Sequence, residues 1–221
     1  MKTVVLLSGG LDSATAAAEA KMQGFELYAL SINYNQRHSK ELLCAEALST
    51  SLGVTAHHIV QLDMPALPSA LTNQTIPVPE DDFHNDGIPI TYVPSRNIIF
   101  LSLAASFAEA IGARDIFAGF NAVDYSGYPD CRTEFVESFQ TTLNIGTKAG
   151  VEGKPFHIHA PLMGLTKADI IRRGMQLNVD YSLTWSCYKG EVRSCGHCDS
   201  CFLRLKGFRE AGLVDPIEYE A

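Results

Sequence analysis

The sequence predicts an α/β protein with a doubly wound, mostly parallel sheet. Residues 3–62 alternate short apolar runs of strand type with helical segments, which is the βαβαβ rhythm of a parallel sheet covered by helices. The chain has 221 residues, 46% of them hydrophobic, which is enough for one large domain. Four clustered cysteines near the C-terminus predict a small metal-binding segment. We therefore expect an α/β domain over residues 1–180, and a metal-binding segment with a terminal helix, packed on it, over residues 181–221.

The individual elements follow from apolar periodicity and from turn residues. Strands are expected at residues 3–7, 25–32, 57–62 and 116–120, with a turn at residues 8–13. Helices are expected at residues 14–21, 39–52, 96–111, 133–146 and 166–176, with a terminal helix that ends near Ala211. Ser39 is the expected N-cap of the second helix, and Thr166 and Asp169 form a T-x-x-D capping pair.

Residues 63–95 interrupt this alternation. Six of the ten prolines lie there, together with an acidic group at residues 80–86. A connection of this length within a compact domain indicates a functional lid, a partner surface or a disordered segment.

Charge and hydropathy restrict the classes of partner. The net charge is −8: residues 1–150 hold 8 basic and 16 acidic residues, and residues 151–221 hold 9 of each. Neither part has the basic excess of a general nucleic-acid binder. The sequence has no apolar run of membrane-spanning length and no signal peptide pattern. We therefore expect a cytoplasmic protein that binds neither nucleic acid nor membrane.

The segment Ser8-Gly9-Gly10-Leu11-Asp12-Ser13 follows a predicted strand and opens a predicted helix. Glycines allow the backbone to approach a ligand closely, and the free amides and dipole of a helix N-terminus favour an anion. The pattern predicts a phosphate cradle without the lysine of the G-x-x-x-x-G-K-[ST] loop. An ordinary tight turn between strand and helix is the alternative interpretation.

The cysteine cluster reads Cys187-x₇-Cys195-x₂-Cys198-x₂-Cys201. Four thiolates at this spacing suit tetrahedral Zn²⁺, and a site closed by four protein ligands is structural. Disulfides are disfavoured in a cytoplasmic protein. A [4Fe–4S] cluster is the stronger alternative, but one cysteine precedes the C-x₂-C-x₂-C trio and no Cys-Pro pair follows it.

The glycine segment resembles the PP-loop of the ATP pyrophosphatases, a group with the adenine-nucleotide alpha-hydrolase type of fold. The resemblance implies cleavage of ATP between its α- and β-phosphates, with the leaving pyrophosphate held by the loop. The implied ATP-binding residues are Ser8, Gly9, Gly10, Leu11, Asp12, Ser13, Ala14 and Thr15. Asp12 is implied to position Mg²⁺ and the loop, with a plain helix-start carboxylate as its alternative role.

The PP-loop and the cysteine cluster together resemble the QueC family, the 7-cyano-7-deazaguanine synthases of queuosine biosynthesis. Further matching segments occur in order between them, including residues 92–97, 119–121, 124–132, 161–167 and 185–188. The resemblance implies that 7-carboxy-7-deazaguanine, free ammonia and ATP are converted into the nitrile through adenylated intermediates and an amide. It also implies a homodimer.

Further residues are assigned to the site by their positions. Lys167 begins a helix, where a cation opposes the helix dipole, so we expect a phosphate contact rather than a solvated lysine. Arg96 is expected to contact phosphate or the substrate carboxylate, and otherwise to lie on the surface. With Asp12, these two residues form the expected catalytic set. The expected substrate-binding residues are Asn97, Asp124, Tyr125, Asp130 and Arg132.

The alternatives for these substrate-binding residues stay open at this point. Asn97 orients a polar ligand edge or caps its helix. Either Asp124 or Asp130 is expected to accept hydrogen bonds from the guanine-like N–H edge. Tyr125, Tyr128 and Trp185 each suit stacking on a flat ring, and each is equally ordinary core material.

Two other functions compete with this interpretation. Another PP-loop adenylating enzyme, such as a tRNA thiolation enzyme, is opposed by the acidic charge balance. A non-catalytic nucleotide-binding module would bind ATP without releasing pyrophosphate.

Overall fold

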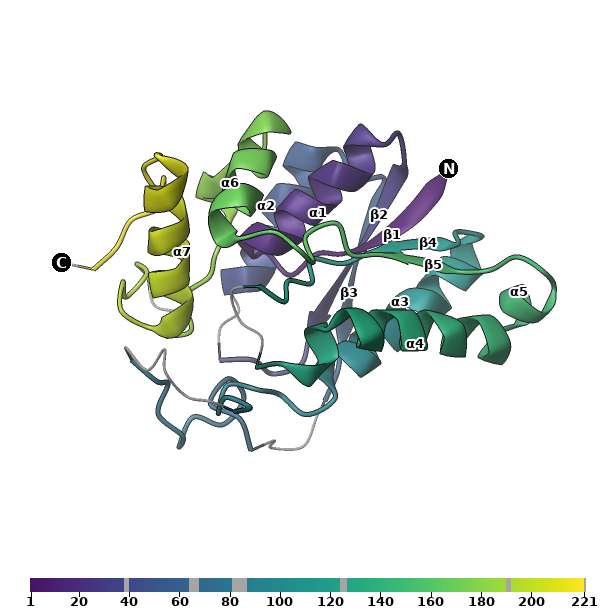
Figure 1. Cartoon of the computed structure of the whole chain (residues 1–221), viewed down its shortest axis with the longest axis horizontal. Coiled ribbons are helices and arrows are strands. Elements are labelled where there is room, and N and C mark those ends of the chain that lie inside the picture. Colours follow the sequence, from purple (N-terminus) through teal and green to yellow (C-terminus); the bar gives the residue numbers. More distant parts are fainter. Residues whose placement is uncertain (38–39, 64–67, 81–86, 124–126, 190–191, 221) are drawn as a thin grey trace.

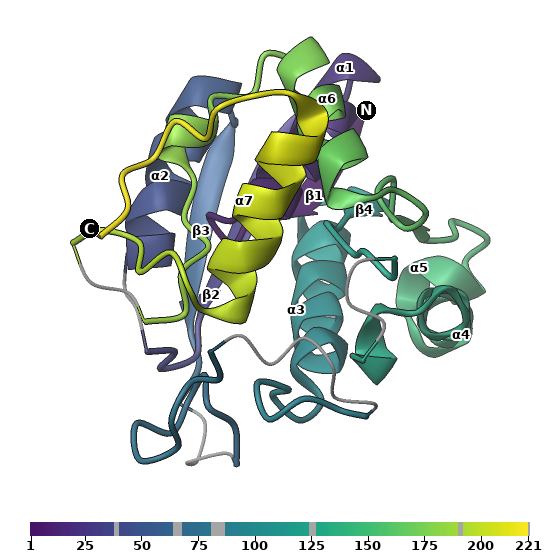
Figure 2. The same ribbon diagram turned by 60° about the vertical axis from the view of Figure 1, so that its left-hand side comes forward.

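A computed structural model describes residues 1–37, 40–63, 68–80, 87–123, 127–189 and 192–220 (Figures 1 and 2). It confirms the predicted α/β class. Five strands form one sheet in the order β3-β2-β1-β4-β5, and all four pairings are parallel. The strands are β1 (Lys2–Leu6), β2 (Glu26–Asn33), β3 (Ala56–Gln61), β4 (Asp115–Phe117) and β5 (His157–His159).

Helices cover both faces of the sheet, because successive strand residues point to opposite faces and both sets are apolar. Val5 and Phe117 pack beneath α1 (Leu11–Met22), α2 (Lys40–Leu52) and α6 (Lys167–Gln176), with α7 (Asp199–Ala211) outside them. Val4 and Ile116 pack against α3 (Arg96–Ile111), α4 (Thr133–Gly146) and the short α5 (Lys148–Val151). Figure 1 shows these two layers above and below the sheet. Two short 3₁₀ turns, Pro129–Cys131 and Tyr181–Leu183, complete the elements.

Most predicted boundaries match the structure closely, and α3 and α4 have the predicted bounds. The first helix was predicted to begin at residue 14, which is wrong: it begins at Leu11, because Gly10 is the extended N-cap and the Ser13 hydroxyl donates to its carbonyl oxygen at 2.9 Å. The strand predicted at residues 116–120 is shorter and covers Asp115–Phe117. The Thr166 cap is confirmed, since its side chain accepts a hydrogen bond from the Asp169 amide. Ser39 lies outside the described residues.

The shorter β4 has a local cause at Gly119. A Cβ at this position would lie 2.8 Å from the carbonyl carbon of Asp12 and 2.9 Å from the Ser13 nitrogen. The chain after β4 therefore passes directly against the start of α1. In the described part of the chain, no helix is both long enough and apolar enough to cross a membrane.

Candidate active site and cysteine cluster

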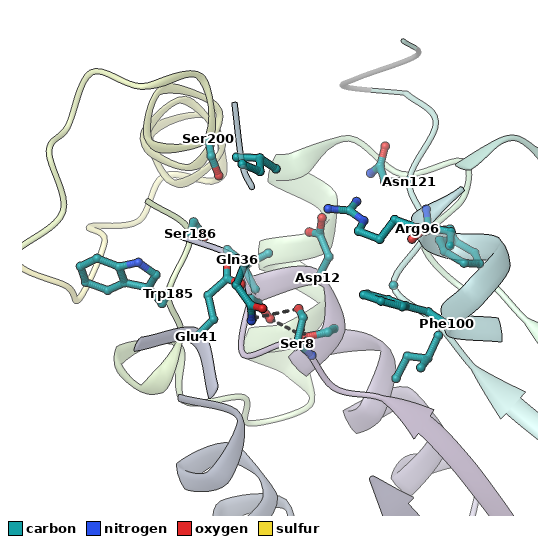
Figure 3. Close-up of a pocket in the computed structure, with 18 of the residues that line it drawn as sticks. Ser8, Asp12, Gln36, Glu41, Arg96, Phe100, Asn121, Trp185, Ser186 and Ser200 are labelled. Atoms are coloured by element: carbon teal, nitrogen blue, oxygen red, sulfur yellow. Dashed lines mark hydrogen bonds between the residues drawn. The ribbon is translucent and has the colours of Figure 1, made fainter. Parts of the chain in front are cut away.

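A cavity of about 340 Å³ opens at the carboxyl ends of β1, β2 and β4. The strand order places β1 between β2 and β4. After β1 the chain adds β2 and β3 on one side of β1, and it later adds β4 and β5 on the other side. Such a reversal point is where open α/β sheets bind ligands. Figure 3 shows the side chains that converge there from the loop after β1, from α2 and α3, and from the segment before α7.

The loop after β1 is held by its own serines. The Ser8 amide donates to the Ser13 hydroxyl at 3.2 Å, and the Gly10 amide donates to the Ser8 hydroxyl at 3.2 Å. Gly9 has φ +90°, and a Cβ there would lie 2.0 Å from the carbonyl oxygen of Glu41, so a side chain is excluded. In the ranges that the structure describes, no side chain caps the N-terminus of α1. The first amides of α1 therefore remain available to an anion in the cavity.

Asp12 and Lys167 form an ion pair in the cavity wall. The Lys167 ammonium donates to both carboxylate oxygens of Asp12 at 2.8 Å, and its side chain is only 16% exposed. The solvated surface lysine that the sequence left open is therefore not what the structure shows. Gly207 of α7 lies against the Lys167 side chain, where a Cβ would be 2.5 Å from its Cγ. The pair brings together residues that are 155 positions apart in the chain.

Arg96 begins α3 and extends into the cavity towards the side where Asp12 lies (Figure 3). The preceding residue, Ser95, has the left-handed φ of 57°, which non-glycine residues adopt rarely and often near functional sites. Burial by itself lowers the pKa of the guanidinium, but Tyr34 and Tyr128 outweigh burial and leave that pKa raised. Arg96 is thus a permanent cation inside the cavity.

The predicted site residues divide into two groups. Those that line the cavity are Ser8, Gly10, Leu11, Asp12, Ser13, Arg96, Asn97 and Lys167. Ala14 and Thr15 are completely buried below the loop, where the Thr15 hydroxyl contacts the Tyr181 hydroxyl at 2.8 Å. Gly9 does not line the cavity; its carbonyl accepts a hydrogen bond from the Trp185 amide at 2.9 Å.

The predicted substrate residues are placed less uniformly. The buried Asp130 carboxylate accepts a hydrogen bond from the Asn97 amide at 3.1 Å and does not line the cavity. The Asn97 side chain donates to the Asp130 carbonyl and to the Cys131 sulfur. Arg132 is exposed outside the cavity. Asp124 and Tyr125 lie outside the described residues. Burial raises the pKa of Cys131 to about 11, so its thiol stays protonated.

Several cavity residues were not singled out from the sequence. Tyr34, Gln36 and Arg37 follow the carboxyl end of β2, and Glu41 lies in the first turn of α2. Ligands of open α/β sheets bind beyond the carboxyl ends of the strands, and this applies to β2 as well as to β1 and β4. The position of these residues just after β2 therefore indicated that they could line the site. Phe100, which packs edge-on against Tyr34 at 5.4 Å, is indistinguishable in sequence from core material of an apolar helix.

The four clustered cysteines converge on one point. The Sγ atoms of Cys187, Cys195, Cys198 and Cys201 all lie within 4.8 Å of one another, and all four residues are buried. Backbone amides of Cys195 and Cys198 donate to the sulfurs of Cys187 and Cys195 at 3.4 and 3.3 Å. A side-chain hydrogen bond with Cys187 raises the pKa of the Cys198 thiol and of the Cys201 thiol. The donor set fits a tetrahedral metal ion.

Arg204 connects this cluster to the PP-loop segment. Its guanidinium is 2% exposed and binds Asp215 through two hydrogen bonds of 2.7 and 2.9 Å. It also donates to the Tyr181 carbonyl and the Thr184 hydroxyl at 3.1 and 2.7 Å. The backbone amide of the next residue, Trp185, donates a hydrogen bond to the Gly9 carbonyl. One buried cation on α7 therefore holds the segment that supports the loop after β1.

Part of the proline-rich connection, residues 63–95, contributes to the cavity wall. Leu71 lines the cavity, and Arg37 donates to the carbonyls of Asn73 and Ile76. Glu80 forms a backbone bridge with Cys198 and an ion pair with Lys189. The described part of this segment is thus attached both to the cavity wall and to the cysteine cluster.

The sheet order, the cavity at its reversal point and the uncapped glycine loop define a protein of the PP-loop nucleotide-binding fold. A solved 4-thiouridine synthetase in complex with RNA and ATP shares this fold, with a TM-score of 0.53 and 20% identity over 82% of this chain and 42% of that chain. The family model of queuosine biosynthesis protein QueC matches residues 2–212. The chain belongs to the QueC family.

Curated relatives agree with this assignment over their full length. A 7-cyano-7-deazaguanine synthase of Cupriavidus necator is 56% identical over 223 residues, covering 100% of this chain and 98% of the relative. A protein of the same name from Xanthomonas oryzae pv. oryzae is 54% identical over 220 residues, covering 99% of this chain and 97% of the relative.

Proposed function

We propose that this protein is an ATP-dependent 7-cyano-7-deazaguanine synthase, a carbon–nitrogen ligase that converts 7-carboxy-7-deazaguanine and ammonia into the nitrile. The observation that carries the proposal is full-length similarity to enzymes of that name, joined to a cavity whose loop presents uncapped helix amides. The cavity volume of about 340 Å³ falls within the usual range for small-molecule sites.

The chemistry requires activation of a poor leaving group. A carboxylate oxygen of the acid attacks the α-phosphorus of ATP, pyrophosphate leaves, and an acyl adenylate forms. Ammonia then displaces AMP and gives the primary amide. In a second activation the amide oxygen attacks the α-phosphorus of another ATP and pyrophosphate leaves again. Loss of AMP and protons from that adduct leaves the C≡N bond. Both activations have the same geometry at phosphorus, so one loop serves both.

The residues of the cavity are suited to positioning and charge stabilisation. The first amides of α1 and the hydroxyls of Ser8 and Ser13 hold the departing pyrophosphate. Lys167 and Arg96 offset negative charge that develops on phosphate and on the substrate carboxylate. Asp12 offers the hard oxygen ligands that Mg²⁺ prefers, and Mg²⁺ bound with ATP neutralises part of the phosphate charge. No covalent nucleophile is needed, which agrees with the protonated state of Cys131.

We further propose that Cys187, Cys195, Cys198 and Cys201 hold Zn²⁺. Four buried thiolates within 4.8 Å of one another leave no open coordination position, so the metal is structural. It stabilises the segment of residues 181–221 against the domain of residues 1–180. Through Trp185 and Gly9 the same metal supports the loop geometry.

The decisive experiment is turnover with isotope-labelled acid. Purified protein, ATP, Mg²⁺, ammonium and 7-carboxy-7-deazaguanine should yield the nitrile, AMP and pyrophosphate. If both carboxylate oxygens carry ¹⁸O, each activation transfers one labelled oxygen to AMP, which mass spectrometry detects. ADP as the sole nucleotide product, or AMP without label, would contradict the mechanism. Salt-sensitive tight binding of tRNA would instead favour a tRNA-modifying PP-loop enzyme.

Assembly and location are part of the same proposal. The enzyme acts as a homodimer in the cytoplasm on small molecules, without nucleic acid or membrane. The net charge of −8 supports the absence of nucleic acid, and the exposed Ile88 and Ile90 of the proline-rich segment offer apolar area for a second copy. Light scattering coupled to size-exclusion chromatography tests the dimer.

A further inference from the structure

Three carboxylates line the cavity in the described part of the chain, and they differ in what they bind. Both oxygens of Asp12 accept hydrogen bonds from Lys167. Asp199 is 3% exposed and directly follows the metal ligand Cys198. The Glu41 side chain makes no hydrogen bond or ion pair with any residue that the structure describes. It is therefore a cavity carboxylate whose acceptor capacity is unused.

The position of Glu41 is well fixed. It lies in the first turn of α2, and its carbonyl packs so tightly against Gly9 that no side chain fits at Gly9. Figure 3 shows its side chain beside Ser8, across the cavity from Phe100. Burial raises the pKa of Glu41 to about 7, against the opposing effect of Arg96. A carboxylate buried at this cost, with no partner among the described residues, indicates a partner that arrives with the ligand.

The chemistry of the proposed substrate supplies such a partner. A deazaguanine presents a ring N–H and an exocyclic N–H side by side on one edge, and two carboxylate oxygens accept both. Adenine has a ring nitrogen acceptor at the equivalent position, so the same carboxylate repels the base of ATP. Of the two aspartates expected to accept this edge, Asp130 already accepts the Asn97 amide and Asp124 lies outside the described residues.

Resting on the proposed function, we infer that Glu41 is the specificity residue that accepts the paired N–H donors of the deazaguanine ring. The flat rings of Tyr34 and Phe100 in the cavity wall suit the faces of the same heterocycle. Arg96, from α3, lines the same cavity and is then the cation that meets the substrate carboxylate.

The test compares two substrates in two proteins. The first substrate is 7-carboxy-7-deazaguanine, and the second is the same acid without its exocyclic amino group. In the wild type, removal of that group should lower kcat/KM by about 10- to 100-fold. In Glu41→Gln, whose amide cannot accept both hydrogens, the natural acid should lose a similar factor, and the two acids should differ by less than about threefold. The KM values for ATP and ammonium should stay unchanged.

Controls separate this inference from its rivals. Glu46→Gln changes an exposed glutamate of the same helix and should behave as the wild type. If Glu41→Gln still discriminates between the two acids as the wild type does, the inference is overturned. A rise confined to the KM for ammonium also overturns it, because that result would assign Glu41 to binding of the nitrogen source. Titration calorimetry of both acids on wild type, Glu41→Gln and Glu41→Asp gives the same comparison without turnover. A wild type that binds neither acid refutes the proposed function itself, whereas binding of both acids with equal affinity refutes the role of Glu41.

Discussion

Replacement of Arg204 by methionine should weaken both the fold and the nucleotide site. The guanidinium and the Asp215 carboxylate have side chains that are 2% and 3% exposed, so the substitution leaves a buried carboxylate without its cation. Breaking such a pair from one side costs about 3–5 kcal/mol. Because a domain is stable by about 5–15 kcal/mol, the variant should still fold when it is loaded with metal.

The assay is urea unfolding of the metal-loaded protein, followed by circular dichroism. With a slope of about 2 kcal/mol per M, the midpoint should fall by about 2 M. The double variant Arg204→Met/Asp215→Leu should lose less than the sum of the two single changes, because neither charge is then left alone. Arg209→Met, on the exposed side of α7, is the matched control.

The same variant has a functional readout. Arg204 holds the Tyr181 carbonyl and the Thr184 hydroxyl, and the adjoining Trp185 amide supports Gly9. The KM for ATP should therefore rise in the folded variant, while the KM for the acid changes less. An unchanged midpoint together with an unchanged KM for ATP would refute the claim that this cation links the cysteine cluster to the loop.

Four further predictions address single features. Gly119→Ala should disturb the start of α1 and raise the KM for ATP, because its Cβ would lie within 2.9 Å of the backbone at Asp12. Gly146→Ala is the control, since a Cβ at that position meets open space and should leave the KM unchanged. Equal KM values for both variants would contradict the close approach. Asp12→Ala should keep the fold but lose about 10²–10³ in ATP-dependent pyrophosphate release, and near-normal release would remove Asp12 from the site. Cys198→Ser should lower zinc content and melting temperature together, and stoichiometric iron with visible absorbance in the wild type would overturn zinc. Because burial raises the pKa of Glu41 from 4.5 to about 7, its ionisation opposes folding above pH 7 and has no cost below pH 4.5. Glu41→Gln should therefore stabilise the substrate-free, metal-loaded protein by about 3 kcal/mol at pH 8 and by much less near pH 5, as measured by urea unfolding. A pH-independent difference would contradict this origin.

The sequence by itself determined the α/β class, the PP-loop and the cluster of four cysteines that could hold a metal. These features are local or strictly spaced: a strand-turn-helix rhythm, a glycine pair with flanking serines, and three cysteines at intervals of three residues. Backbone conformation and ligand spacing within such segments depend on near neighbours, so they can be read without knowledge of the fold. The ends of the first helix and of β4 were less predictable, because Gly119 and the loop determine each other's position from opposite parts of the chain.

Only the tertiary structure decided which side chains share the cavity. It pairs Asp12 with Lys167 and directs Asp130 to the start of α3. It also leaves the Glu41 side chain facing the cavity without a partner among the residues that the structure describes. The physical reason is that hydrogen-bond partners and burial depend on contacts between residues far apart in sequence. A carboxylate satisfied by a distant amide and one left for a ligand look the same in a single sequence.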